Sequence, residues 1–172
     1  MIREMDAAES DVVGALLLRC NEEHRAHFPP AVAASYLAEV ADVARRVDTC
    51  DVVVAERGGR LVGSATLVRD AADDGHPWPA GGAVLRLLAV DPPARGAGLG
   101  EALTLACISR ARTADASYVG LHTAAFMTAA RHVYERLGFA RAPEHDFDPD
   151  AYYGAGPQAG RAPWGLAYLL TL

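Results

Sequence analysis

The feature that most constrains the fold is an apolar run that leads through a glycine-rich turn into an amphipathic helix. Residues 83–90 (AVLRLLAV) are almost continuously apolar, which predicts a central strand covered on both faces. Residues 91–100 (DPPARGAGLG) form the turn, and apolar positions then recur at helical spacing to about residue 113. A helix that begins at such a turn presents unpaired backbone N–H groups at the positive end of its dipole. This arrangement is typical of a phosphate-binding turn.

Three kinds of site compete for the glycines of this turn. Gly96, Gly98 and Gly100 lack a Cβ atom, so the backbone can approach a pyrophosphate closely, and Arg95 can add a charge-assisted contact. A dinucleotide fingerprint requires a different glycine spacing, because Glu101 follows directly after the last glycine. A P-loop requires a lysine, and the chain contains none. An R-x-x-G-x-G phosphate site and a glycine turn without an anion stay open at this point.

A second motif lies in residues 127–139, where Ala130, Tyr134, Gly138 and Phe139 follow a fixed spacing. Taken with the R-x-x-G-x-G turn, it resembles the GNAT superfamily of N-acetyltransferases. The resemblance is strongest over residues 83–139, and Met127 stands where many members carry an asparagine that contacts CoA. It implies acetyl-CoA as cosubstrate and a small-molecule or peptide amine as acceptor. Because a thioester is already an activated acyl donor, no metal is expected.

The resemblance also implies roles for individual residues. The pyrophosphate would be bound by Arg95, Gly96, Ala97, Gly98, Leu99 and Gly100. The acyl carbonyl and the pantetheine arm would lie along Leu88, Ala89 and Val90, on a strand that splays from its neighbour. Val90 would donate its amide to the oxyanion, and Tyr134 would donate a proton to the departing CoA thiolate.

The base that removes the proton of the amine has two candidates. These are Glu56, at the end of a predicted hairpin strand, and His122, on the strand that follows the cofactor helix. The acidic and imidazole groups of residues 144–146 are excluded as a metal site, because neighbours on a strand point to opposite sides. We expect the acceptor pocket between the first two helices, the loop 70–82 and the loop 148–163, with Trp78, Tyr152 and Tyr153 in its walls or in a dimer contact.

The periodicity predicts one α+β domain over residues 1–172, in the order β-α-α-β-β-β-α-β-α-β-β. Its mixed, mostly antiparallel sheet carries helices on both faces. The helices are expected to end near residue 29, residue 47, residue 113 and residue 137, and 52–56 with 61–68 forms a hairpin. The last strands cover 139–147 and 164–171, and the apolar stretch 166–170 could pair with a second copy to form a homodimer.

Composition limits the partners. The net charge of −6 and a pI near 5.4 argue against nucleic acid and favour a cationic substrate. Cys20, Cys50 and Cys107 are too widely spaced for a zinc site or a disulfide framework. No signal-peptide pattern and no membrane-length apolar run occurs, so we expect a cytoplasmic protein without membrane contact.

Two other functions remain compatible with the same sequence. The chain could be a catalytically silent module that binds or senses acyl-CoA, because neither candidate base is decisive. The same phosphate-binding turn could also serve transfer of another acyl group, or transfer to a hydroxyl. The identity of the acceptor amine is set by loops that the sequence does not specify.

Overall fold

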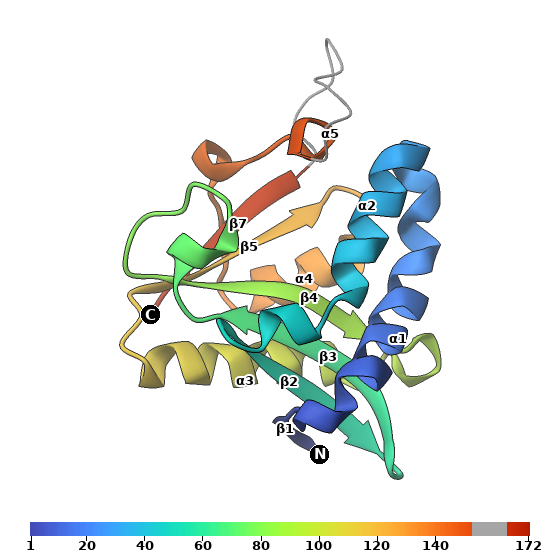
Figure 1. The fold of residues 1–172 in the computed structure, drawn as a ribbon. Coiled ribbons are helices and arrows are strands. Elements are labelled where there is room, and N and C mark those ends of the chain that lie inside the picture. The colour runs from blue at the N-terminus through green and yellow to red at the C-terminus, as the bar shows by residue number, and fades with distance from the viewer. Residues whose placement is uncertain (153–164) are drawn as a thin grey trace.

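The computed structural model describes residues 1–152 and 165–172, which form a seven-stranded sheet with helices on both faces (Figure 1). The strand order is β1-β2-β3-β4-β5-β7-β6, and neighbouring strands are antiparallel except for the parallel pair β4 and β5. The strands are β1 (Ile2–Glu4), β2 (Cys50–Arg57), β3 (Arg60–Val68), β4 (Ala83–Val90), β5 (Tyr118–Ala124), β6 (Ala140–Arg141) and β7 (Gly165–Thr171). The predicted α+β class is confirmed.

Two pairs of helices cover the two faces of the sheet. Helices α1 (Ser10–Asn21) and α2 (Pro30–Ala41) lie on one face, and α3 (Leu99–Thr113) and α4 (Thr128–Arg136) lie on the other (Figure 1). The alternation along β2 explains this layering, since Val52 and Val54 pack under α1 and α2 while Val53 and Ala55 pack under α3. The strand is therefore apolar at successive positions because both of its faces are buried.

The expected helix lengths need correction at the N-terminal end. The first helix stops at Asn21, and a 3-10 segment (Glu22–His27) continues the chain to the Pro29–Pro30 pair. The second helix stops at Ala41 instead of residue 47, and a short 3-10 turn (Ala44–Arg46) follows. Neither 3-10 segment buries a residue, so the packing of each helix against the sheet ends before the chain reaches the expected helix end.

The expected strand 139–147 is wrong. Ala140–Arg141 pairs with β7 as the short strand β6, a 3-10 turn (Pro143–His145) then interrupts the ladder, and Phe147 forms only an isolated bridge to Gly165. Pro143 has no N–H to contribute to a ladder. The amide of Ala167 instead donates to the Asp146 carboxylate at 2.7 Å, which takes the place of a backbone acceptor. Residues 144–146 therefore do not alternate across a strand, and the argument that excluded them as a metal site does not apply.

The last strand does not offer the free edge that dimerisation by strand pairing needs. Strand β7 pairs with β5 along its whole length, from Gly165 to Thr171, and with β6 at Tyr168 and Leu169 on its other side. A second copy therefore cannot pair with Tyr168 and Leu169, the middle of the expected 166–170 contact, because β6 already occupies that edge. Within the described residues, no helix is long and apolar enough to cross a membrane. A short helix, α5 (Pro149–Tyr152), precedes the residues that the structure does not describe.

Candidate active site

The site forms where the two parallel strands of the sheet separate. Strands β4 and β5 pair from Ala83 and Val119 up to Leu85 and Leu121, and their pairing stops there although both strands continue. Beyond this fork, β5 pairs with β7 on its other side and β4 pairs with β3. The predicted splay is thus present, and it opens a gap in the middle of the sheet.

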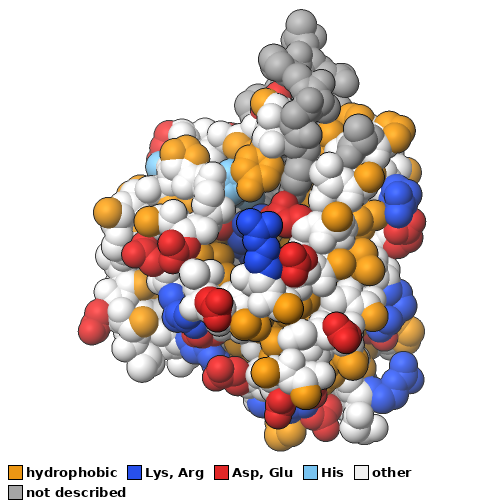
Figure 2. All heavy atoms as spheres, viewed as in Figure 1, with side chains coloured by type: hydrophobic (Ala, Val, Ile, Leu, Met, Phe, Trp, Pro, Cys, Tyr) orange, Lys and Arg blue, Asp and Glu red, His pale blue; other side chains and the backbone are white. Residues whose placement is uncertain are grey.

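A cavity of about 730 Å³ occupies this gap, within the size range of small-molecule sites in proteins. It runs from the fork along β4 to the start of α3, and the loop after α1 and helix α4 close its sides. Figure 2 shows acidic, basic and histidine side chains gathered near the centre of this face. The predicted site residues that line it are Leu88, Ala89, Val90, Arg95, Gly96, Gly98, Leu99, Gly100, His122 and Tyr134.

A β-bulge distorts β4 at the fork. Arg86 pairs with Thr66, and Ala89 pairs with Ser64. Two residues of β4, Leu87 and Leu88, therefore face the single residue Ala65 of β3. One of these two, Leu87, has a φ of +53°, a left-handed conformation that costs a residue other than glycine about 1–2 kcal/mol. The bulge turns the end of β4 away from a regular ladder, and it lies where the strand borders the cavity.

The register after the bulge sets the direction of the Val90 amide. The amide of Asp91 donates to the carbonyl of Val62 at 2.8 Å, so these two residues form a hydrogen-bonded pair between β4 and β3. The next pair, Gly63 and Val90, is then a non-hydrogen-bonded pair, because the two kinds alternate in antiparallel sheets. The N–H and C=O of Val90 consequently point away from β3, towards the gap. Arg95 Nε reaches this carbonyl at 3.0 Å.

The turn before α3 presents a row of amides without protein partners. No amide from Gly96 to Glu101 donates a backbone hydrogen bond to another described residue, and Gly98 caps α3 without a side-chain contact. Gly96 and Gly98 have φ values of +78° and +74°, which their lack of a side chain permits. The amides and the helix dipole together make a site for an anion that opens into the cavity. The predicted Ala97 belongs to this turn but does not line the cavity.

The arginine of the turn is already paired. The Arg95 guanidinium makes two hydrogen bonds to the Glu23 carboxylate, at 2.7 and 3.1 Å. Glu23 lies in the segment after α1, so this ion pair connects that segment to the turn across the cavity. A phosphate at the turn would therefore compete with Glu23 for Arg95.

Tyr134 lies at the cavity wall on α4, with only 6% of its surface exposed. Burial raises the pKa of its hydroxyl, so the group keeps its proton at neutral pH. The hydroxyl makes no hydrogen bond to another described residue. It is held in place by packing, with its ring 5.7 Å from that of Phe139, centroid to centroid. Gly138 follows the end of the helix with a φ of +91°, as is typical of a C-terminal cap.

His122 stands at the fork and lines the cavity. Its Nε2 lies 2.8 Å from the carbonyl oxygen of His145, and because a carbonyl can only accept, Nε2 carries the hydrogen. The other nitrogen, Nδ1, is then the acceptor of the neutral ring. Burial lowers the pKa of His122 to about 4, so the ring is neutral at neutral pH.

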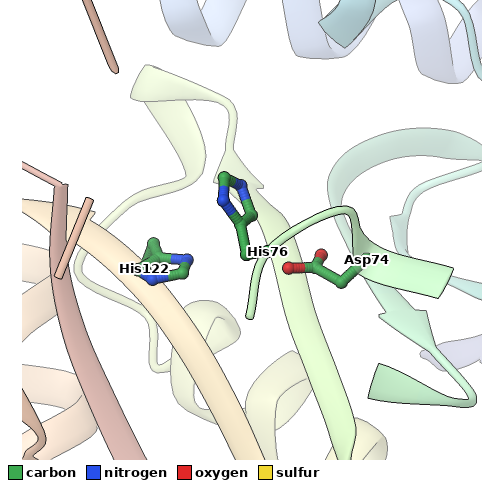
Figure 3. A group of neighbouring side chains, drawn as sticks. All are labelled: Asp74, His76 and His122. Carbon is green, nitrogen blue, oxygen red and sulfur yellow. The ribbon is translucent and has the colours of Figure 1, made fainter. Parts of the chain in front are cut away.

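Two residues that the sequence reasoning missed meet His122 at this point. Asp74 and His76, from the loop 70–82, each bring a ligand atom to within 4.8 Å of one on His122 (Figure 3). Asp74 is buried, its Oδ2 accepts from Trp78 Nε1 at 2.8 Å, and Arg86 Nη1 lies 3.5 Å from its Oδ1. The signals for these residues were a loop rich in acidic residues and an arginine that interrupts an apolar strand, but neither reveals its partners.

Other predicted residues lie away from the cavity. The Glu56 carboxylate pairs with Arg3 at 2.9 Å beside β1 and does not line the cavity. Trp78 lies behind Asp74, where it packs on Gly120 and supports the wall instead of forming it. Tyr152 is 44% exposed and contacts the ring of His76.

Two further predictions concern Tyr153 and Cys107. Tyr153 and most of the loop 148–163 lie outside the described residues. Cys107 is fully buried on α3. Its thiol therefore takes no part in the site.

Comparison with known proteins places this geometry in a family. The family model described as "Acetyltransferase (GNAT) family" matches residues 15–139. A mycothiol acetyltransferase of Cellulomonas flavigena is 36% identical over 118 residues, which cover 67% of this chain and 32% of that protein. One of Thermobispora bispora is 39% identical over 94 residues, covering 55% and 31%. The chain thus spans about a third of the length of these relatives.

Solved structures agree on the fold. The PaiA N-acetyltransferase of Thermoplasma acidophilum, solved in complex with coenzyme A, superposes with a TM-score of 0.73 at 12% identity, covering 100% of this chain and 98% of that one. An acetyltransferase of Streptococcus agalactiae gives 0.71 at 20% identity, covering 100% and 98%. With a family model that covers most of the chain and the splayed strands, amide turn and tyrosine in place, the chain belongs to the GNAT family of acetyltransferases.

Proposed function

We propose that this chain transfers an acetyl group from acetyl-CoA to an amine by direct attack on the thioester. The observation that carries the proposal is the row of unpartnered amides from Gly96 to Glu101, which opens into the cavity between β4 and β5. These amides and the dipole of α3 suit the pyrophosphate of CoA. The pantetheine arm would then lie in the gap along β4, with the thioester near the fork.

The chemistry needs few groups because a thioester is already activated. The amine nitrogen attacks the carbonyl carbon, and the oxyanion that forms accepts a hydrogen bond from the Val90 amide. The C–S bond then breaks, and its electron pair leaves on sulfur. Tyr134 donates its proton to this thiolate. The proton of the amine passes to His122 Nδ1, directly or through water. We assign the base to His122, because Glu56 is bound to Arg3 and lies outside the cavity.

A thiol-release assay with acetyl-CoA and a panel of amines tests this function. We expect turnover with at least one amine, and Tyr134→Phe should lower kcat by roughly 10²-fold with little change in the KM for acetyl-CoA. Glu56→Gln is the matched control and should retain the rate of the unmodified chain. An unchanged rate in Tyr134→Phe would remove the proposed acid.

The same assay separates the alternatives. Calorimetric binding of acetyl-CoA without thiol release from any amine would identify a silent acyl-CoA-binding module. Faster release with an alcohol, or with a longer acyl-CoA, would change the acceptor or the donor but keep the binding site. The mycothiol acetyltransferases match too little of their own length to carry their acceptor over to this chain.

A further inference from the structure

The segment that follows α1, residues 22–28, is attached on both sides of the cavity, and we call it the strap. At one end, the Glu23 carboxylate accepts two hydrogen bonds from Arg95, in the turn that follows β4. At the other end, the ring of His27 stacks on Phe126, in the turn that follows β5, with centroids 4.0 Å apart and an interplanar angle of 8°. The strap therefore connects the turns that follow the two strands bordering the gap.

Most of the strap lies outside the core. Its 3-10 part, Glu22–His27, is exposed or half-buried throughout, and Phe28 alone is buried. The end of α1 is fixed independently, because Arg19 Nε lies 3.1 Å from Asp91 Oδ1 and Cys20 packs in the core. Segments with few buried contacts open locally at low cost. The strap can therefore move without unfolding α1.

The polar attachment of the strap is weak and exchangeable. The side chains of Glu23 and Arg95 are each 43% exposed, and ion pairs as exposed as this contribute little to stability. The hydrogen bonds from Arg95 lower the pKa of Glu23, so the carboxylate keeps its charge at neutral pH. Such a contact is easily exchanged for another anion that reaches Arg95.

The ion pair uses the donors that an anion at the turn would use. Arg95 Nε donates to the Val90 carbonyl at 3.0 Å, which holds the guanidinium beside the turn, and its other two nitrogens both donate to Glu23. Phosphate is an acceptor of the same bidentate kind. Glu23 lines the same cavity as the glycines of the turn, so its carboxylate would also repel a phosphate bound there.

We propose that the Glu23–Arg95 ion pair is a latch that holds the strap over the cavity, and that an anion bound at the amide turn releases it. The inference rests on the proposed function, because the anion would be the pyrophosphate of CoA. The coupling is reciprocal. The latch lowers the affinity of the turn for the anion, and the bound anion takes Arg95 and loosens the strap. His24 and Phe28 line the cavity, so release of the strap changes the wall beside α1 and α2.

Calorimetric titration with inorganic pyrophosphate tests the latch, because this small anion fills the turn without reaching the rest of the cavity. At constant ionic strength, Glu23→Gln should bind pyrophosphate and CoA roughly 2- to 10-fold more tightly than the unmodified chain. Glu22→Gln is the matched control. It removes the same charge from the neighbouring residue, whose carboxylate pairs with Arg25 and lies outside the cavity, and it should leave both affinities unchanged.

Two results of this titration would overturn the latch. Equal affinity in Glu23→Gln and in the unmodified chain would show that the ion pair does not compete with the anion. Weaker binding in Glu23→Gln would show that Glu23 positions Arg95 for the anion, which is the opposite role. Thermal melts check that both variants fold, as expected for exposed side chains.

Hydrogen exchange reports on the strap itself. Saturating pyrophosphate should speed amide exchange in residues 22–28 by roughly 2- to 5-fold in the unmodified chain and in Glu22→Gln. Glu23→Gln should exchange at the faster rate without the anion and should gain little from it. Slower exchange with pyrophosphate would show that the anion tightens the strap, and it would overturn the proposal.

Thiol release separates the latch from the proposed function. Turnover of acetyl-CoA, with equal pyrophosphate affinity in Glu23→Gln and Glu22→Gln, would keep the function and overturn the latch. Tighter pyrophosphate binding and faster strap exchange in Glu23→Gln, without thiol release from any amine, would support the latch and overturn the function. Failure of pyrophosphate and CoA to bind to every form of the chain would overturn both.

Discussion

Replacing Gly98 with alanine tests the phosphate-binding turn with a cost that the structure sets. Gly98 has a φ of +74° at the start of α3, and a Cβ atom there would meet no heavy atom within 4 Å. The penalty is therefore conformational and not steric, and the left-handed region costs alanine about 1–2 kcal/mol. In a chain of 172 residues this corresponds to a fall in Tm of roughly 2–8 °C.

Gly100→Ala is the matched control two residues later. Gly100 lies inside α3 without a positive φ, and a Cβ atom there would lie 3.9 Å from Val90 Cγ2, an ordinary contact. Alanine is favoured over glycine inside a helix by about 0.5–1 kcal/mol. The same chemical change should therefore raise Tm at this position and lower it at Gly98.

The effect on CoA follows from the same strain. In the free protein, alanine at Gly98 can recover part of the cost by moving the turn, and CoA must then restore the bound geometry. Affinity should fall by up to that free energy, roughly 5- to 30-fold, as measured by calorimetric titration with CoA. A Gly98→Ala protein that melts like the unmodified chain would refute the conformational argument. One that is destabilised but binds CoA with full affinity would show that the phosphates lie elsewhere.

Three further predictions concern buried groups. Burial lowers the pKa of His122 from 6.5 to about 4, so the unfolded chain binds more protons than the folded chain between these pH values. The free energy of unfolding, measured in urea, should therefore fall by up to about 1.4 kcal/mol per pH unit as pH drops through this window. The fall should be smaller in His122→Gln, and a rise in the unmodified chain would contradict the assignment. The Ser64 hydroxyl is buried without a partner among the described residues, so Ser64→Ala should raise unfolding free energy by about 1 kcal/mol, and a loss of stability would show that the hydroxyl is bonded. Burial raises the pKa of the Cys107 thiol to about 12, so thiol reagents should label it only in denaturant, and labelling of the native chain would contradict its burial.

The centre of the fold was predictable because its signals are local. An apolar strand, a glycine turn and an amphipathic helix occupy consecutive residues from Ala83 to Thr113, and each is defined by its own spacing. The predicted strand at 139–147 failed for one local reason, Pro143, and for one non-local reason. There the Asp146 carboxylate accepts a hydrogen bond from the amide of Ala167 in place of a backbone carbonyl. The alternation of apolar and polar residues does not reveal such a contact.

The acceptor end of the site was not predictable, because it is assembled from distant segments. Asp74 and His76 come from a loop, Arg86 comes from β4, and His122 comes from β5, on the other side of α3 in the sequence. In the sequence these residues stand apart: Asp74 is one of several acids in a loop, and Arg86 and His122 are single polar residues in otherwise apolar strands. Only the parallel pairing that ends at Leu85 brings these exceptions to one fork.

The fork also explains why binding and chemistry share one strand. After Leu85, β4 keeps β3 as its partner on one side and loses β5 on the other, so the backbone groups of Val90 face the cavity. Exposed strand amides need a hydrogen-bond partner, and a ligand that carries amide groups of its own can supply one where the neighbouring strand has turned away. On the proposed function, the pantetheine arm fills this role. The bulge at Leu87 lies just beyond the last pair between β4 and β5, at the point where the gap begins.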